Sequence, residues 1–203
     1  MNIIYERNIS MKKYEEEKYK FENIKDKIYP WVKEELVDSQ ALNGKHFSEK
    51  DAPVVVFLEE IKIIFVIRRG ESVFEVLKDN MLPPECDIID LYHTACENLA
   101  RDVEFVIANT WYGAYGIVAD GYHEASALCL KHIWQVCVEK LQDDLVIVAP
   151  CKDTILFAPA GKTEIVDKMI EHGQTSYDQS TDRISMRPML FSREGKELCV
   201  YED

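Results

Sequence analysis

The chain has 203 residues, of which 47% are hydrophobic and 30% are charged, a composition typical of a folded globular protein rather than a disordered one. Its formal net charge of −13 argues against nucleic acid as a main partner, because phosphate binding depends on clustered Lys and Arg. The same acidity suits a basic protein partner.

The first residues, MNIIYERNISMKKYEEE, carry charges where a secretory signal needs an uninterrupted apolar core. Apolar runs further along, such as VVVFL and IIFVI, are far shorter than the roughly 20 residues that a membrane-spanning helix needs. We therefore expect a cytoplasmic protein with no membrane partner.

Residues 1–42 predict an N-terminal helical arm. Between residues 10 and 29, apolar residues recur at helical spacings, with Ser10 as the N-cap; they are Met11, Tyr14, Phe21, Ile24 and Ile28. Pro30 should end this helix and begin a second short one with Trp31 facing inward. The arm either packs on the main body or contacts a second subunit, which would make the protein a homo-oligomer.

The next segment, 42–53, is polar and aperiodic, so it predicts a loop in which His46 is solvated. The runs VVVFL, IKIIFVI and SVFEVL that follow are rich in β-branched and aromatic residues. They predict two or three antiparallel strands, with a turn at Gly70 between the last two.

Residues 87–101 predict a helix, because their apolar side chains share one face. On its outer face, His93 lies within helical reach of Asp90 and Glu97. This trio fits a metal or acid–base cluster, but a solvated face with pairing between successive turns explains it as well.

The segments VEFVIAN and WYGAYGIVAD predict two strands around a turn near Asn109. Trp111, Tyr112 and Tyr115 bring a large aromatic area to the second segment. These rings either fill the core or, where exposed, form a stacking platform for a ligand. Burial decides between the two.

Asp120 and Gly121 then lead into a predicted helix that runs to Leu141, which Asp120 would cap. His123 and Glu124 fall in its first turn, where Glu124 gains from the helix dipole.

The segments LVIVA and TILFA predict two buried strands joined around Pro150, with Asp153 bonding the amides of the turn. A helix over residues 161–172 should follow and end at Gly173. The tail, RISMRPMLF and KELCVYE around REG, predicts a final hairpin.

Together these elements predict an α+β fold, with a mostly antiparallel sheet and helices packed on it, plus the N-terminal arm. Residues 43–203 should form one compact domain with a single sheet. The six cysteines contain no CxxC pair, so we interpret them as small buried residues of a reducing compartment. A thiol nucleophile at Cys151 is the less favoured alternative.

No P-loop, GxGxxG, HExxH, GxSxG or zinc spacing is present in the sequence, and nothing in it calls for a cofactor. The candidate binding residues are Asp120, His123, Asp153, Trp111 and Tyr122. The favoured hypothesis is a binding or regulatory module that meets a basic protein through an acidic surface, for example an immunity protein that neutralises a basic toxin. The alternative is a hydrolase or metal-dependent enzyme that uses Asp120, His123 and Asp153.

The order and spacing of several segments resemble the YtpQ-like family of uncharacterised bacterial proteins, over roughly residues 85–198. The segments are ENLARDVEFVIANTWYG, VADGYHEASALCL, DDLVIVAPCKDTILFAP and SMRPMLFSREGKEL. The resemblance implies an intracellular α+β protein of unknown activity, with Asp120, Gly121, Pro150 and Asp153 at the matching positions. Cys151 and Lys152 stand where relatives vary, and the first 50 residues look less like the family.

Overall fold

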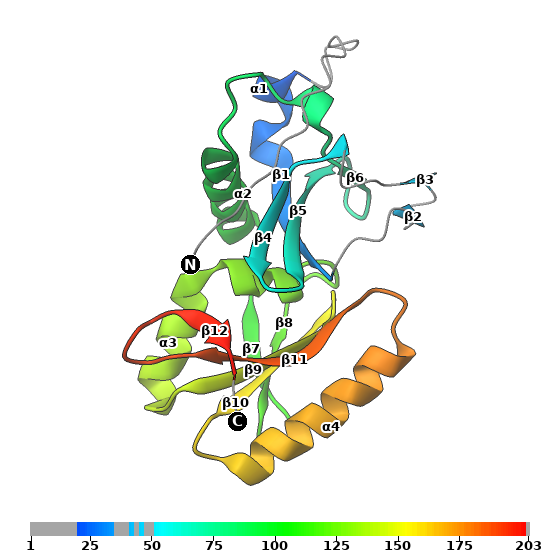
Figure 1. The fold of residues 1–203 in the computed structure, drawn as a ribbon. Helices are drawn as coiled ribbons and strands as arrows, with labels where there is room; N and C mark the ends of the chain where they lie inside the picture. Colours follow the sequence, from blue (N-terminus) through cyan, green and yellow to red (C-terminus); the bar gives the residue numbers. More distant parts are fainter. Residues whose placement is uncertain (1–19, 35–40, 43–44, 47–50, 202–203) are drawn as a thin grey trace. The chain divides into compact units, whose positions relative to one another are not determined.

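The structure is a computed structural model that describes residues 20–34, 41–42, 45–46 and 51–201. The predicted α+β class is confirmed, since helices accompany antiparallel sheets (Figure 1). The described residues fall into two compact units, one ending at Asp102 and the other beginning at Val103. The boundary expected after residue 42 adjoins residues 43–44, which lie outside the described residues.

The expected helical arm is in part a strand. Its residues 1–19 and 35–40 lie outside the described residues. The remainder forms a short helix, a 3-10 turn and a strand: α1 (Phe21–Ile24), η2 (Lys25–Lys27) and β1 (Ile28–Lys33). A helix beginning at Pro30 is therefore wrong. The six residues of β1 are rich in β-branched and aromatic side chains and all are buried, which favours a strand.

The first unit contains a four-stranded sheet in which β5 pairs with β1, β4 and β6. The strands are β4 (Val54–Leu58), β5 (Ile61–Arg68) and β6 (Phe74–Val76), followed by the 3-10 turn η4 (Asp79–Met81). The sequence predicted two or three antiparallel strands here, and the structure has three. The preceding segment is not all loop, because β2 (Ala41–Leu42) pairs with β3 (Lys45–His46).

Helix α2 (Ile88–Asp102) confirms the predicted helix and packs on β1. Asp87 caps it, with Oδ1 accepting the N–H of Ile89 at 2.7 Å. Buried Asn98 donates from Nδ2 to the carbonyl of Ile28 at 3.0 Å, and the Tyr29 hydroxyl donates to Asp102 at 2.7 Å. These polar contacts fix the helix against the strand. His93 is exposed, as a solvated face predicts.

The second unit has its own six-stranded sheet, ordered β12-β11-β9-β10-β8-β7 and antiparallel throughout. The prediction of one sheet after residue 50 is therefore wrong. The strands are β7 (Val106–Asn109), β8 (Tyr115–Val118), β9 (Leu145–Cys151), β10 (Thr154–Pro159), β11 (Arg183–Phe191) and β12 (Leu198–Val200). All were predicted as strands, including the final hairpin of β11 and β12.

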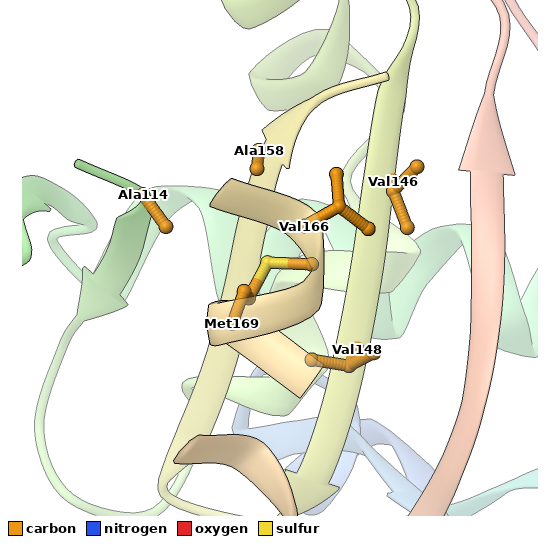
Figure 2. Packing of buried hydrophobic residues seen from close by; sticks show 6 residues of the cluster. All are labelled: Ala114, Val146, Val148, Ala158, Val166 and Met169. Atoms are coloured by element: carbon orange, nitrogen blue, oxygen red, sulfur yellow. The ribbon is translucent and has the colours of Figure 1, made fainter. Parts of the chain in front are cut away.

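Helix α4 (Thr163–Gln179) packs across β9, β10 and β11. Figure 2 shows Val166 and Met169 of this helix among residues of the sheet, a cluster completed by Ala114, Val146, Val148 and Ala158. The predicted stop at Gly173 is wrong, because the helix continues six residues beyond it. Gly173 serves close packing instead, since a Cβ there would lie 3.1 Å from Cε of Met186.

The helix predicted after Asp120 is divided. A 3-10 segment, η5 (Ala125–Cys129), precedes helix α3 (Lys131–Leu141). Leu130 separates them with non-helical backbone angles, φ −103° and ψ 80°. Trp134 of α3 is buried against Phe157, with ring centroids 5.5 Å apart. Among the described helices, none has both the length and the apolar character needed to cross a bilayer.

Candidate protein-interaction surface

The turn between β7 and β8 places Trp111 at the tip of a hairpin. Thr110 closes the turn, because its N–H and its hydroxyl both donate to the carbonyl of Ala114, at 2.9 Å and 3.0 Å. Gly113 adopts a φ of 95°, which favours glycine, and a Cβ there would lie 3.3 Å from Cδ1 of Ile165. The turn is therefore closed by two hydrogen bonds and lies close to Ile165 of α4.

Trp111 is 85% exposed, the highest exposure among the large hydrophobic side chains of the described residues. Its ring nevertheless has two aromatic neighbours, with centroids 5.5 Å away at Tyr112 and 5.3 Å away at His172 of α4. Both contacts are edge-to-face, a favoured geometry for aromatic rings. The indole is thus presented to solvent in a defined position.

Tyr112 supports this arrangement by stacking on His172, with centroids 4.4 Å apart and planes 14° from parallel. Burial raises the pKa of its phenol, and a hydrogen bond with Thr110 opposes this in part. Tyr112 also packs against the core cluster beneath α4. Of the rings predicted as core or platform, Tyr115 belongs to the core side, because it stacks on Phe157 at 5.2 Å.

The outward side of α4 is acidic. Its exposed carboxylates recur at spacings of three, four and seven residues, which places them on one stripe of the helix; they are Glu164, Asp167, Glu171 and Asp178. Lys168 is the single exposed basic residue within the helix. His172 lies about 100° round the helix axis from Glu171, so the aromatic residues flank the acidic stripe rather than lie on it. We call these four carboxylates together with the flanking Trp111, Tyr112 and His172 the aromatic–acidic surface.

Asp120 and His123, two of the predicted site residues, are brought together. Nδ1 of His123 lies 2.9 Å from Oδ2 of Asp120, and Oδ1 accepts the N–H of Tyr122 at 3.0 Å. Burial favours a higher pKa for Asp120, but the hydrogen bond and charge of His123, with the backbone N–H groups, outweigh it and lower the pKa. Asp120 therefore caps a turn and not the helix that the sequence predicted it would cap, because η5 begins at Ala125 and α3 at Lys131.

Glu124 has a structural role that the sequence did not indicate. Its Oε1 accepts the N–H groups of Ala119 at 3.0 Å and Gly121 at 2.8 Å. The side chain is buried and lies ahead of η5, seven positions before the first residue of α3, so the expected interaction with the dipole of that helix does not apply. Glu124 instead fixes the chain where it leaves β8.

Tyr122, another predicted binding residue, is half-buried and lies beneath a lysine. Nζ of Lys152 is 5.2 Å from the centroid of the Tyr122 ring, within range of a cation–π contact. The carbonyl of Lys152 accepts the N–H of Ala125 at 3.0 Å, and its ammonium pairs with Asp182 at 3.8 Å. Lys152 thus joins the loop after β8 to the turn between β9 and β10.

Asp153 is exposed in that turn and accepts the thiol of Cys151 at 3.2 Å. The turn consists of Lys152 and Asp153, so β9 runs through Pro150 rather than ending at it. The register between β9 and β10 shifts near Pro150, and a bulge is a place where a sheet accepts proline. The interaction expected with turn amides is replaced by the thiol contact.

Neither a metal centre nor a reactive thiol can be assigned to the loops that carry Asp120, His123, Cys151 and Asp153. Within the ranges that the structure describes, no group of three or more His, Cys, Asp or Glu residues is arranged to hold a metal ion. Burial raises the pKa of Cys151, which disfavours the thiolate that a nucleophile requires. Of the six cysteines only Cys137 and Cys151 are buried, so the interpretation of all six as buried residues is wrong.

Comparisons with family models, curated proteins and solved structures gave no match to this chain. The resemblance to the YtpQ-like family therefore stays a prediction.

Proposed function

We propose that this chain is a cytoplasmic protein-binding module whose aromatic–acidic surface meets a basic protein. The observation that carries the proposal is Trp111, which is 85% exposed although two neighbouring rings fix its position. A single exposed apolar side chain is common on a protein surface, but Trp is enriched at the energetic centres of protein interfaces.

Preorganisation strengthens this argument. An indole that is free to rotate loses conformational entropy on binding, whereas contacts with Tyr112 and His172 already restrict Trp111. The stacked pair of Tyr112 and His172 extends the apolar area beside it. A partner side chain can therefore pack on the indole at little ordering cost.

Charge supplies the preference for a basic partner. The carboxylates of α4 lie on the helix that carries His172, and the chain as a whole has a net charge of −13. Such a surface attracts cationic partners at long range and speeds their association. An immunity protein that neutralises a basic toxin is one form of this proposal.

The alternative proposal is a hydrolase or metal-dependent enzyme that uses Asp120, His123 and Asp153. Its support is the contact between Asp120 and His123, an arrangement that can orient an imidazole for proton transfer. His123 is fully buried, and Asp153 contacts Cys151, so we rank this function second.

The test titrates the full chain with a short Lys/Arg-rich peptide and follows Trp fluorescence and calorimetric heat. Fluorescence is suited to the question because Trp31 and Trp134 are only 7% and 1% exposed, so changes at the surface report Trp111. We expect saturable binding that Trp111→Ala weakens by about tenfold or more, the usual effect of losing an interface hot spot.

A charge-matched pair of variants separates a defined surface from general attraction. Asp167→Asn/Glu171→Gln removes two carboxylates from α4, and Glu194→Gln/Glu197→Gln removes two exposed carboxylates elsewhere in the same unit. The first variant should weaken peptide binding more than the second. Equal losses, or unchanged affinity in Trp111→Ala, would reject the proposal.

A further inference from the structure

Strand β7 forms one edge of the six-stranded sheet, and β8 is its partner strand among the described residues. An edge strand presents unused backbone donors and acceptors that can pair with another chain. The register of β7 against β8 shows which residues of β7 have backbone groups that face away from the sheet. The N–H of Thr110 bonds to Ala114, opposite it on the β8 side, and hydrogen-bonded pairs alternate along an antiparallel ladder.

By this alternation, Ala108 and Val106 bond to β8, whereas the backbone groups of Ile107 and Asn109 face outward from the sheet. The free groups are thus spaced two residues apart, as a further antiparallel strand requires.

The side chains of β7 and its neighbour are unusually apolar for an edge. Val106 is 51% exposed and lies opposite Val118 of β8, which is 53% exposed, while Ile107 on the other face is 41% exposed. No residue of β7 is charged, although charged residues and prolines are the usual means by which proteins prevent edge pairing. The opposite edge differs, since Lys196 and Glu197 directly precede β12.

We propose that β7 pairs with β7 of a second copy of this chain, antiparallel and centred on Ile107, to give one sheet that continues through both copies. A two-fold axis perpendicular to the sheet keeps each face continuous and places residues of the same face opposite each other. Ile107 then meets Ile107, and Val106 meets Ala108 of the second copy. The reciprocal backbone bonds come from the outward groups of Ile107.

Charge favours a second copy in this orientation. The nearest charged residue before β7 is Glu104, and centring on Ile107 places it opposite the uncharged Thr110 of the other copy. Antiparallel pairing therefore brings no like charges together, despite a net charge of −13 per chain. Parallel pairing would set the two Glu104 carboxylates side by side and is disfavoured. Because each copy contributes a short strand, we expect a dimer that dissociates on dilution.

Sedimentation velocity and light scattering on the full chain, from micromolar to millimolar concentration, test the proposal. Ile107→Pro removes an outward N–H without touching a bond to β8, and Val106→Lys adds a charge to the edge. Val136→Lys is the matched control, because Val136 is 48% exposed on α3, away from the strands. Circular dichroism establishes that each variant is folded.

We expect a concentration-dependent dimer for the wild type and for Val136→Lys, with association weakened at least tenfold in the two edge variants. A wild-type mass of one chain at every concentration would overturn the proposal. So would a dimer that both folded edge variants retain.

Disulfide trapping tests the register. In a Cys199→Ser background, which removes the exposed thiol, Ile107→Cys should form an intermolecular disulfide, because hydrogen-bonded pairs have Cα atoms about 5.5 Å apart. Val106→Cys is the control, since its two copies would be separated by more than the roughly 7 Å that a disulfide spans. Equal trapping at both positions would contradict the register. A monomer that still binds the basic peptide would reject this inference alone.

Discussion

Oδ2 of Asp120 lies 2.9 Å from Nδ1 of a fully buried histidine, His123, three residues along the chain. The carboxylate also accepts the backbone N–H groups of Tyr122 and His123, at 3.0 Å and 3.1 Å. This relationship makes the loop after β8 sensitive to acid.

The pKa of Asp120 is lowered in the folded protein, so its stabilising contribution is complete above the unfolded pKa of about 3.9 and is lost as the pH falls through the folded pKa. We expect Asp120→Ala to reduce the free energy of unfolding by about 1 kcal/mol at neutral pH, as loss of a cap does. The difference from wild type should shrink below about pH 4. Urea unfolding at several pH values measures it. A difference that is constant down to pH 2 would contradict the assignment.

Glu124 should matter more for stability than its position in a loop suggests. Glu124→Ala leaves the N–H groups of Ala119 and Gly121 without their acceptor, in a partly buried setting. We expect a loss of about 1–3 kcal/mol in the free energy of unfolding. Glu194→Ala, at an exposed position, is the control and should change it by less than about 0.5 kcal/mol. Equal effects of the two substitutions would argue against this role.

Gly173 should reject a larger side chain. A Cβ at this position meets Cε of Met186 at 3.1 Å and Cγ2 of Val148 at 3.4 Å, so Gly173→Val would overpack the contact between α4 and the sheet. We expect a loss of about 1–3 kcal/mol, measured by thermal or urea unfolding. Adding Met186→Ala should recover part of it. No recovery in the double variant would place the cause elsewhere.

The cysteines should react in an order set by exposure. Cys199 is exposed, while Cys137 is buried and its pKa is raised to about 11 by that burial. At pH 8 a maleimide should therefore modify Cys199 first and leave Cys137 unmodified until the protein is denatured. Mass spectrometry of timed digests gives the order. The Cys199→Ser variant should lack the fastest phase, and rapid labelling of Cys137 would contradict the burial.

Period and composition identified most strands and helices of the second unit because these have one face or both in the core. Strand β9, for example, is buried along its whole length and β10 over most of it, and both are short apolar runs in the sequence. The division into two sheets could not be foreseen, because strand pairing depends on contacts distant in sequence that local patterns do not encode.

Two errors concern single residues whose structural role depends on tertiary contacts. Pro30 was interpreted as the start of a helix, yet the residues around it are β-branched and aromatic, and the buried strand β1 prevailed over the helical spacing before it. Gly173 was interpreted as a helix end, yet the absence of a side chain serves packing against Met186. In both cases one residue type has two structural uses, and tertiary contacts select between them.

The candidate site was foreseen in part. The sequence predicts Trp111 as a candidate because of its large aromatic side chain, and it predicts Asp120 and His123 because both lie where a strand leads into a helical segment. The structure shows Trp111 exposed and Asp120 in contact with His123. His172 was missed, since its stacking on Tyr112 joins residues 60 positions apart, a contact that no spacing rule indicates. For Glu124 the sequence predicts an interaction with a helix dipole, whereas the structure shows hydrogen bonds to the N–H groups of Ala119 and Gly121. The prediction is wrong because the helix begins only after Leu130, and no Pro or Gly in the sequence marks that break.

The hydrogen bonds between β1 and α2 have a consequence for biosynthesis. Asn98 bonds to a carbonyl 70 residues earlier, and Asp102 accepts a hydroxyl 73 residues earlier. Once β1 has been translated, about 70 further residues must follow before these bonds can form. We expect chaperones that shield apolar strands to bind β1 during that interval.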